Sequence, residues 1–291
     1  MPPVLRILFG TTAIMLFIAV LAYGYVFSGW FTKKRSIDEH VDFVSPHFVF
    51  RAPHGPEVFP PAVVIVPGCL GTNPYHATWS EFFVSQGWAT LTVDSFSPRG
   101  LHKPSALQRV CDGSRPWGFE RAADIIAAVK HLEQMPGVGE DKIVLAGWGH
   151  GGWAVMDALS FGETSRSTNL TGFSPDWAAG VQGVVLFDPY CGFGSRSKEY
   201  GWQVDADVLM FLSDADQSHE AGLCMRTGKK LIADGHIVNV IMFGHASHPD
   251  DSDTAAPISY FRNDALMAPR ARAYVATLLQ SISTNSQNKG E

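Results

Sequence analysis

The chain has 291 residues, of which 46% are hydrophobic and 17% charged, and its net charge is −6. This length predicts one domain of roughly 250 residues with a short extension. The apolar content is enough for a large core and too high for a disordered chain. Because the globular part is acidic and has no basic run, nucleic acid is not expected as a partner.

Residues 1–31 are predicted to form an N-terminal membrane anchor. From residue 7 to residue 31 the chain carries no charge and is mostly apolar. About 20 such residues span the hydrocarbon core of a bilayer. A cleaved signal peptide is the alternative, but the apolar run continues past Ala22-Tyr23-Gly24, where cleavage would fall. The sequence therefore favours a single-pass transmembrane helix.

The side of the membrane on which the soluble domain lies stays open. Arg6 precedes the span, and Lys33-Lys34-Arg35 directly follow it. By the positive-inside rule, this distribution places the domain on the cytoplasmic side. Against this, proteins with a short N-terminus and a large C-terminal domain are often exported.

The cysteines do not decide the compartment. No Cys-x-x-Cys spacing is present, so a zinc or redox motif is not indicated. Cys191 and Cys224 both follow predicted strands and could pair if the domain is exported. Four unpaired, partly buried thiols, Cys69 and Cys111 included, are the alternative.

The remaining chain predicts a linker at 32–45, an α/β domain at 46–283 and a flexible tail at 284–291. In the domain, short β-branched runs alternate with helical patterns, which is typical of a mainly parallel sheet with helices on both faces. Helices are expected at 119–132 and 270–282 from apolar residues spaced three and four apart. Strands are expected at 47–51, 62–67, 88–94, 142–146, 181–188, 205–213 and 236–243.

The most informative motif follows the strand predicted at 142–146. It reads Gly147-Trp148-Gly149-His150-Gly151-Gly152 and leads into a predicted helix. A strand, a glycine-rich turn and a helix are the setting of the nucleophile elbow Gly-x-Ser-x-Gly. Here the residue at the tip is Gly149, which has no side chain with which to attack a substrate.

Other polar groups follow the predicted strands, where parallel sheets gather their functional residues. Gly68-Cys69-Leu70-Gly71 follows the strand at 62–67, and Ser95-Phe96-Ser97-Pro98-Arg99-Gly100 follows the strand at 88–94. Asp214 and Asp216 follow the strand at 205–213, and His245 and His248 follow the last strand. Elbow, acid and histidine stand in the chain order of an α/β-hydrolase triad.

Together these motifs resemble the dienelactone hydrolase family of α/β-hydrolases, from about residue 62 to residue 248. The resemblance implies the α/β-hydrolase fold and hydrolysis of esters or lactones, without a cofactor. It implies Asp216 as the acid, with Asp214 as the competing candidate, and His248 as the general base. The oxyanion hole would be the backbone N–H of His150 with that of Cys69 or Leu70. The family's Ser or Cys nucleophile falls on Gly149.

A dinucleotide site and a metal site are two alternatives that the sequence disfavours. Gly147, Gly149 and Gly152 also fit the dinucleotide fingerprint Gly-x-Gly-x-x-Gly, but they follow several βα units instead of the first strand. His245, Asp250, Asp251 and Asp253 are expected on a solvated loop, because their spacing does not indicate a metal site.

Three functional hypotheses follow. In the first, the chain is a membrane-anchored, non-catalytic binding or regulatory module for a small ester- or lactone-like ligand. In the second, it is a slow hydrolase that uses water activated by His248. In the third, it is a variant of an active serine or cysteine hydrolase. In all three, the fold tolerates Gly149, since glycine adopts the strained angles of an elbow tip freely.

Overall fold

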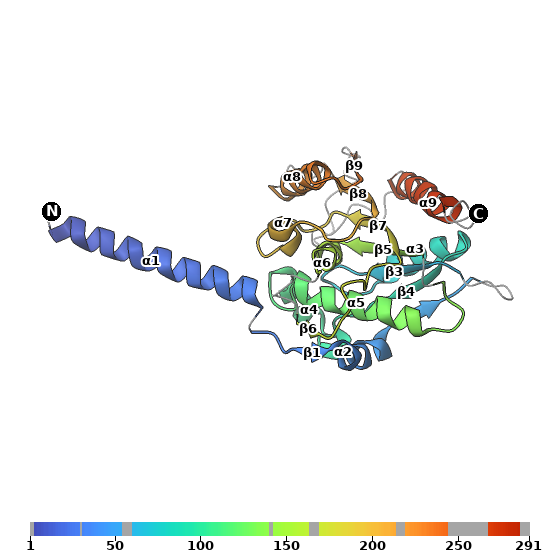
Figure 1. Ribbon diagram of the computed structural model, residues 1–291, viewed down its shortest axis with the longest axis horizontal. Helices are drawn as coiled ribbons and strands as arrows, with labels where there is room; N and C mark the ends of the chain where they lie inside the picture. Colours follow the sequence, from blue (N-terminus) through green and yellow to red (C-terminus); the bar gives the residue numbers. More distant parts are fainter. Residues whose placement is uncertain are drawn as a thin grey trace.

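The computed structural model describes residues 3–29, 31–53, 60–139, 142–162, 169–213, 219–243 and 267–285. Its centre is a seven-stranded sheet in the order β2-β4-β3-β5-β7-β8-β9. Helices cover both faces of this sheet, and one further helix projects away from the domain (Figure 1). The predicted α/β architecture is confirmed.

The sheet is mainly parallel, as predicted. Only the edge strand β2 runs antiparallel, against β4; every other pair of neighbours is parallel. All seven predicted strands are present, with ends shifted by a few residues. Their bounds are β2 Val49–Arg51, β3 Ala62–Val66, β4 Ala89–Thr92, β5 Ile143–Trp148, β7 Val181–Phe187, β8 Asp207–Ser213 and β9 Val238–Phe243.

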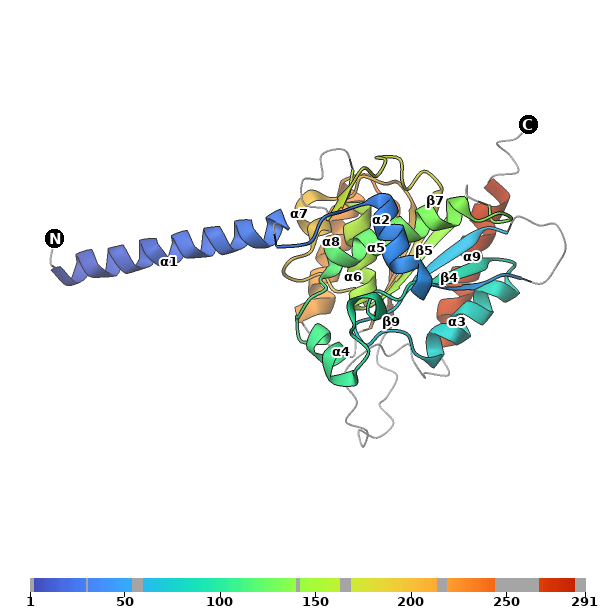
Figure 2. The ribbon, with the colours of Figure 1, turned by 90° about the horizontal axis from the view of Figure 1, so that it is seen from below.

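The helices divide between the two faces of the sheet (Figure 2). One face packs against α2 Ile37–Val44, α5 Gly118–Gln134, α6 His150–Leu159 and α8 His219–Ala233. The other packs against α3 Pro74–Ser85 and α9 Met267–Asn285. Shorter elements are β1 Arg35–Ser36, η1 Ser45–His47, η2 Ser97–Arg99, α4 Pro104–Cys111, β6 Leu170–Thr171 and α7 Arg196–Tyr200.

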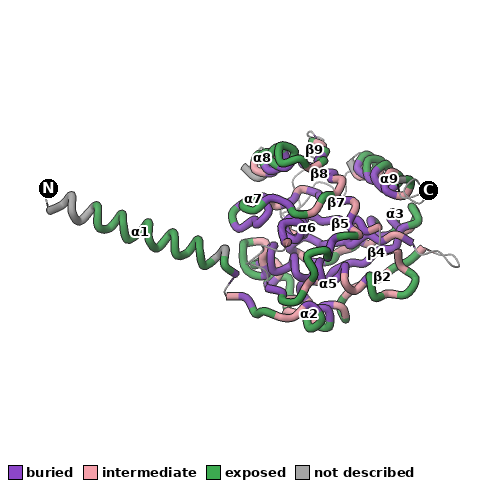
Figure 3. Tube along the Cα trace, viewed as in Figure 1, coloured by how far each residue is buried: buried purple, intermediate pink, exposed green. Residues whose placement is uncertain are grey.

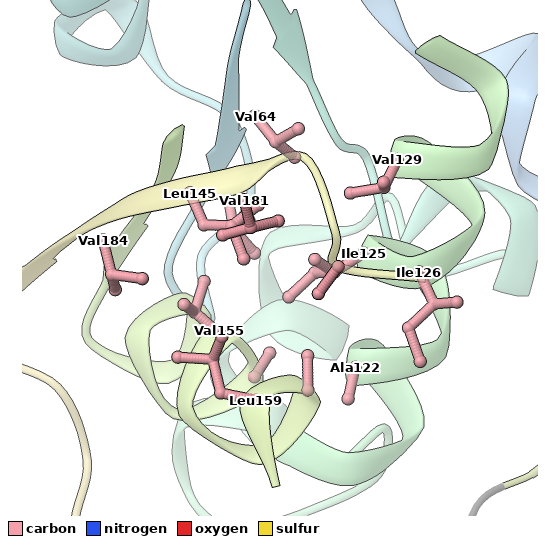
Figure 4. Close-up of a cluster of buried hydrophobic side chains, with 14 of the residues drawn as sticks. Val64, Ala122, Ile125, Ile126, Val129, Leu145, Val155, Leu159, Val181 and Val184 are labelled. Carbon is pink, nitrogen blue, oxygen red and sulfur yellow. The ribbon is translucent and has the colours of Figure 1, made fainter. Parts of the chain in front are cut away.

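Strand β3 shows why its sequence is continuously apolar. Val64 packs toward α5 and α6, while Val63 and Ile65 pack toward α3 and α9, and all three are fully buried. Figure 4 shows the first of these layers, in which Val64 and Leu145 of the sheet meet side chains of α5 and α6. Successive strand residues point to opposite faces, so a strand covered on both sides needs an apolar residue at every position.

The segment 32–45 differs from the irregular linker that we expected. It contains β1, which pairs with β6, and the helix α2. A capping box starts α2, because the Ser36 hydroxyl accepts the N–H of Glu39 and the Glu39 carboxylate accepts the N–H of Ser36. Ile37, Val41 and Val44 lie on the buried side of the helix. This helical spacing is the signal that the charged composition of the segment masked.

The chain order places a switch point at β3. After β2 the chain enters at β3, returns to β4 beside it, and then crosses to β5 on the other side of β3. Loops leaving neighbouring strands on either side of such a point separate, which opens a crevice at the carboxyl ends of the strands. The loops after β3 and β5 therefore border the expected site.

Helix α1, Pro3–Ser28, extends away from the domain (Figures 1 and 3). Its side chains are described from Phe9 to Tyr25 and at Ser28, and large apolar residues are exposed along it. Among the described residues, we find no helix that combines the length and the apolar character needed to cross a membrane.

All four cysteines form disulfides. Cys191 pairs with Cys224, as one of our two alternatives expected, and Cys69 pairs with Cys111. The alternative of four unpaired thiols is wrong. The second pair was not foreseen, because it depends on α4 returning to the loop after β3, which sequence spacing does not show.

Candidate active site

The turn between β5 and α6 has the backbone of an elbow. Gly149 lies between the two elements with φ 50° and ψ −114°. Its N–H donates to the carbonyl oxygen of Phe187 on β7, and its own carbonyl accepts the N–H groups of Trp153 and Tyr190. These angles are unfavourable for a residue with a side chain. The elbow tip is thus held in a conformation that glycine adopts without strain.

The glycines around the tip are needed for a different reason, which is close packing. A Cβ on Gly151 would lie 2.1 Å from the carbonyl oxygen of Val66, and one on Gly147 would lie 2.8 Å from backbone atoms of Gly151 and Gly152. By contrast, the nearest described atom to a Cβ on Gly149 would be the Asp188 carbonyl oxygen, at 4.0 Å. Among these glycines, position 149 is therefore the one at which the described residues leave room for a Cβ.

The loop after β3 lies against the elbow. The N–H of Gly71 donates to the carbonyl oxygen of Gly68, so Cys69 and Leu70 form the centre of a turn. A Cβ on Gly68 would lie 3.4 Å from the carbonyl oxygen of Trp148. The structure therefore brings the predicted oxyanion residues Cys69, Leu70 and His150 to the same edge of the sheet as Gly149. The Cys69–Cys111 disulfide ties this loop to α4.

Arg121 of α5 connects the loop after β3 to the elbow through hydrogen bonds to both. Its side chain is fully buried; one terminal nitrogen donates to the carbonyl oxygen of Pro67 and the other to Nδ1 of His150, at 3.0 Å. A guanidinium only donates, so Nδ1 accepts and the proton of the neutral ring lies on Nε2. Burial and the Arg121 charge hold the pKa of His150 well below its usual value. His150 is therefore a neutral imidazole at pH 7.

Comparison with known proteins identifies the family to which this elbow belongs. Residues 49–276 match the dienelactone hydrolase family. The chain belongs to this family. No match was found among curated proteins.

Solved structures of similar fold include family members and esterases. A dienelactone hydrolase from Anabaena variabilis ATCC 29413 has 15% identity and a TM-score of 0.54, covering 80% of this chain and 90% of its own. A dienelactone hydrolase-like promiscuous phosphotriesterase from metagenomic libraries has 18% identity and a TM-score of 0.58, and the match covers 81% of this chain and 92% of the other. Thermogutta terrifontis esterase 2, phosphonylated by cyclosarin, has 15% identity and a TM-score of 0.58, and the match covers 81% of this chain and 88% of the other. At identities this low, the structural likeness shows a shared fold and nothing about activity.

In this dienelactone hydrolase family member, the predicted acid and base lie outside the described residues. These are Asp214 or Asp216 and His248; His245 and the acids at 250, 251 and 253 lie outside as well. Their roles stay predictions. No group of three or more potential metal ligands occurs in the part of the chain that the structure describes.

Asp188, which the sequence analysis did not select, borders the open position. Its φ of 41° is the one positive value among the described non-glycine residues. Its carboxylate accepts the N–H of Ser213 at 2.7 Å and the Ser213 hydroxyl at 3.2 Å. Asp188 thereby fixes the end of β8, from which the loop with Asp214 and Asp216 departs. Its strained backbone is a signal that only coordinates reveal.

A buried carboxylate lies on α6 below the elbow. Asp157 is fully buried and accepts the N–H groups of Arg196 and Ser197, at 2.6 and 3.2 Å. Burial raises its pKa to about 7, against the opposing effect of these N–H groups and of the Arg196 charge. Asp157 holds the start of α7 against the helix that begins at the elbow.

Asp157 predicts a pH-dependent stability. The pKa of Asp157 rises from its ordinary value of 3.8 to about 7 in the folded state, so between pH 4 and pH 7 the folded state holds a proton that the unfolded state has lost. The protonated carboxyl therefore contributes fully to the free energy of unfolding below about pH 4, and this contribution is lost as pH rises to 7. Asp157→Asn removes the titration and keeps the acceptor oxygen. The free energy of unfolding of the variant should therefore rise relative to wild type from pH 4 to 7, by up to about 1.4 kcal/mol per pH unit.

Guanidinium unfolding at several pH values measures this difference. Asp176→Asn, at an exposed carboxylate, is the control and should show a constant difference from wild type. A constant difference for Asp157→Asn as well would contradict the raised pKa.

The dinucleotide interpretation of the same glycines gains no support. Gly147 and Gly151 are required because the protein's own backbone approaches them, and a Cβ on Gly152 would lie 2.8 Å from Pro189. The fingerprint itself requires a tight turn at its first glycine and close packing at its third, so these contacts do not single it out, and the motif follows β5 instead of the first strand of the sheet.

Proposed function

We propose that this chain is a membrane-anchored dienelactone hydrolase-like protein of the ester and lactone hydrolase class. Its nucleophile position is occupied by Gly149, which makes it weak or inactive as a catalyst. The observation that carries the proposal is the contrast between position 149 and its neighbours. The elbow angles are present and the described residues leave space for a Cβ, but the side chain is missing.

The rest of the elbow supports a site built for acyl transfer. The N–H of His150 is the first of α6, where the helix dipole favours a developing negative charge. The turn at Cys69 and Leu70 lies beside it, and Arg121 connects the two. An ester or lactone carbonyl could therefore be polarised in this site although the protein offers no nucleophile at position 149. Slow hydrolysis by water activated by His248 is the residual activity we expect.

Assays of the wild-type chain test the proposal. Small activated esters such as p-nitrophenyl butyrate should be hydrolysed slowly, with no burst, because no acyl-enzyme forms. A fluorophosphonate probe should leave the mass of the protein unchanged. Brisk turnover together with a covalent adduct would sink the proposal, since both require a nucleophile elsewhere.

A non-catalytic binding or regulatory module on the same fold is the second candidate. The observation in its favour is that the elbow and the loop after β3 stay in place without a nucleophile. In that case an ester or lactone should bind with measurable affinity and be released unchanged.

The membrane anchor remains part of this proposal. The uncharged run at 7–31 supports it, as does the exposure of apolar side chains at consecutive positions of α1. Ile14, Met15, Leu16, Phe17 and Ile18 are each more than half exposed. Consecutive residues point in all directions around a helix, so no single face is buried against protein. A bilayer is the surrounding that fits a helix apolar on every side.

Truncation tests the anchor. The cut is best placed after residue 29, because Phe31 packs against Trp117 and Phe119 of the domain. Removing residues 1–29 should move the protein from the membrane fraction to the soluble fraction. If the truncated protein stays with membranes under high salt, or if the mature natural chain already begins near residue 25, the anchor proposal fails.

For the side of the membrane, we propose the non-cytoplasmic side. The two disulfides favour an oxidising compartment, and this weighs against the positive charges at 33–35. When cells are lysed directly into denaturant that contains a thiol-alkylating reagent, no cysteine should be modified before reduction and four should be modified after it. Four reactive thiols before reduction would place the domain in the cytosol.

A further inference from the structure

A pocket of about 270 Å³ lies at the foot of α1, on the side of the domain where the helix joins it. Its walls come from the segment after α1, from α2, from the loop after η2 and from the start of α5. Four of its lining residues are cations, namely Lys33, Arg35, Arg99 and Arg115. Such a concentration of positive charge in one concave site calls for a counter-charge.

Two of the four cations already have carboxylate partners. Arg99 binds both oxygens of Asp124, at 2.9 Å each, and Arg115 binds both oxygens of Glu120 through Nε, at 3.0 Å. Glu120 lines the pocket as well, and its second role is to accept the N–H of Trp117. These pairs build the wall and leave no carboxylate there for the other two cations.

Lys33 and Arg35 have no ion-pair partner of their own. In the described part of the chain neither makes an ion pair or donates a side-chain hydrogen bond to a carboxylate; the Glu39 carboxylate attracts both at longer range and does not line the pocket. The Arg35 guanidinium stacks on the Phe43 ring, 3.9 Å from its centroid, which fixes its position at the pocket wall. Burial and the nearby Arg99 lower the pKa of Arg35, against the opposing attraction of Asp124 and Glu39. An anion bound between Lys33 and Arg35 would relieve the remaining repulsion.

Asn169 adds a buried polar group to the same pocket. It is 4% exposed, and its side-chain oxygen has no hydrogen-bond partner among the described residues. The two ends of an amide are interchangeable in such a position. Turned over, the amide of this lining residue has an N–H donor in place of the unpartnered oxygen, which suits an anion with several acceptor oxygens.

We propose that this pocket binds a phosphate group, held by Lys33, Arg35 and the amide of Asn169. Its place indicates the source. Thr32 lines the pocket and lies four residues after the end of α1, at most about 14 Å away along the chain. If α1 inserts in a bilayer, as proposed above, the pocket opens at the level of lipid headgroups. The phosphate of an anionic lipid is then the ligand nearest to the pocket, and a free phosphate compound is the alternative source.

The binding test uses the full-length chain in a non-ionic detergent, with inorganic phosphate as the probe. Calorimetric titration at constant ionic strength should give a submillimolar Kd. Lys33→Gln removes a charge-assisted hydrogen bond and should weaken binding about tenfold, while Lys33→Arg retains most of it. Lys34→Gln is the matched control, because Lys34 is the next residue and does not line the pocket; it should change the Kd less than twofold.

Equal losses for Lys33→Gln and Lys34→Gln, or no phosphate binding at 10 mM, would overturn the site. The source is separated in nanodiscs. If a lipid headgroup fills the pocket, phosphatidylglycerol nanodiscs should suppress phosphate binding relative to phosphatidylcholine nanodiscs, and equal binding in both identifies free phosphate as the ligand. A chain that binds phosphate in detergent but does not enter nanodiscs disproves the anchor and leaves the pocket standing.

Discussion

Gly149→Ser is expected to raise the hydrolysis of p-nitrophenyl esters by about 10³-fold or more over wild type, the scale on which loss of a nucleophile lowers hydrolase activity. The described residues leave space for a Cβ at position 149, the nearest of their atoms being 4.0 Å away. On the proposed assignment, His248 removes the serine proton and the N–H of His150 holds the oxyanion. The elbow backbone already has the required angles, so on this assignment the substitution supplies the missing nucleophile.

Two controls make the result specific. Gly149→Ala carries the same Cβ and the same backbone strain without a hydroxyl, and its activity should stay at the wild-type level. His248→Ala in the Gly149→Ser background should lose the gain. Gly149→Ser should also acquire the mass of a fluorophosphonate probe, because its hydroxyl would be the nucleophile that such a probe modifies.

An equal activity for Gly149→Ser and Gly149→Ala would contradict the proposal. The same backbone would then lack a working base or oxyanion hole, and the binding-module hypothesis would gain. Gly149→Cys offers an independent check, because a thiolate needs less help from the base than a hydroxyl.

Gly151→Ala is expected to destabilise the domain by about 3 kcal/mol or more, at the upper end of what overpacking costs. The new methyl group would lie 2.1 Å from the carbonyl oxygen of Val66 and 2.5 Å from that of Pro67. Both are backbone atoms of the central strand and its loop, so neither can rotate away. Helix α6 would have to move off β3, which would also open the packed layer shown in Figure 4.

Gly149→Ala is the matched comparison for this experiment too. Its expected cost is backbone strain, about 1–3 kcal/mol, because among the described residues the added Cβ meets no close neighbour. Thermal unfolding of the full-length proteins, followed by near-ultraviolet circular dichroism, should rank wild type above Gly149→Ala and Gly149→Ala above Gly151→Ala. The reverse order of the two variants would show that α6 can shift and that the elbow tip is the tighter position.

The strands, the main helices and the elbow could be predicted from sequence because their signals are local. A strand such as β3 is buried on both faces, and this requires a run of apolar residues that is readable without coordinates. The same holds for α5, whose apolar residues recur at helical spacing. The family motifs around Gly149 are also contiguous, so the loops they form could be named in advance.

Other features depend on residues far apart in the chain. The composition of segment 32–45 suggested a linker, and although Ile37, Val41 and Val44 have helical spacing, the surface of α5 that buries them is supplied by a distant part of the chain. The Cys69–Cys111 pair needs α4 to return to the loop after β3. In each case the partner is supplied by the packing of elements, which is a property of the folded chain.

An α/β protein with a glycine at the tip of its elbow could be predicted before the fold was known, because those properties rest on neighbouring residues and their periodicity. The folded chain was needed to show which glycines are required for close packing and at which one the described residues leave room for a Cβ. It was also needed to show that Arg121 and Asp188 fix the loops beside Gly149, and that two cations at the foot of α1 make no ion pair among the described residues. Distances between backbones and compensation between charges arise when strands and helices pack, so they cannot be read from the order of residues.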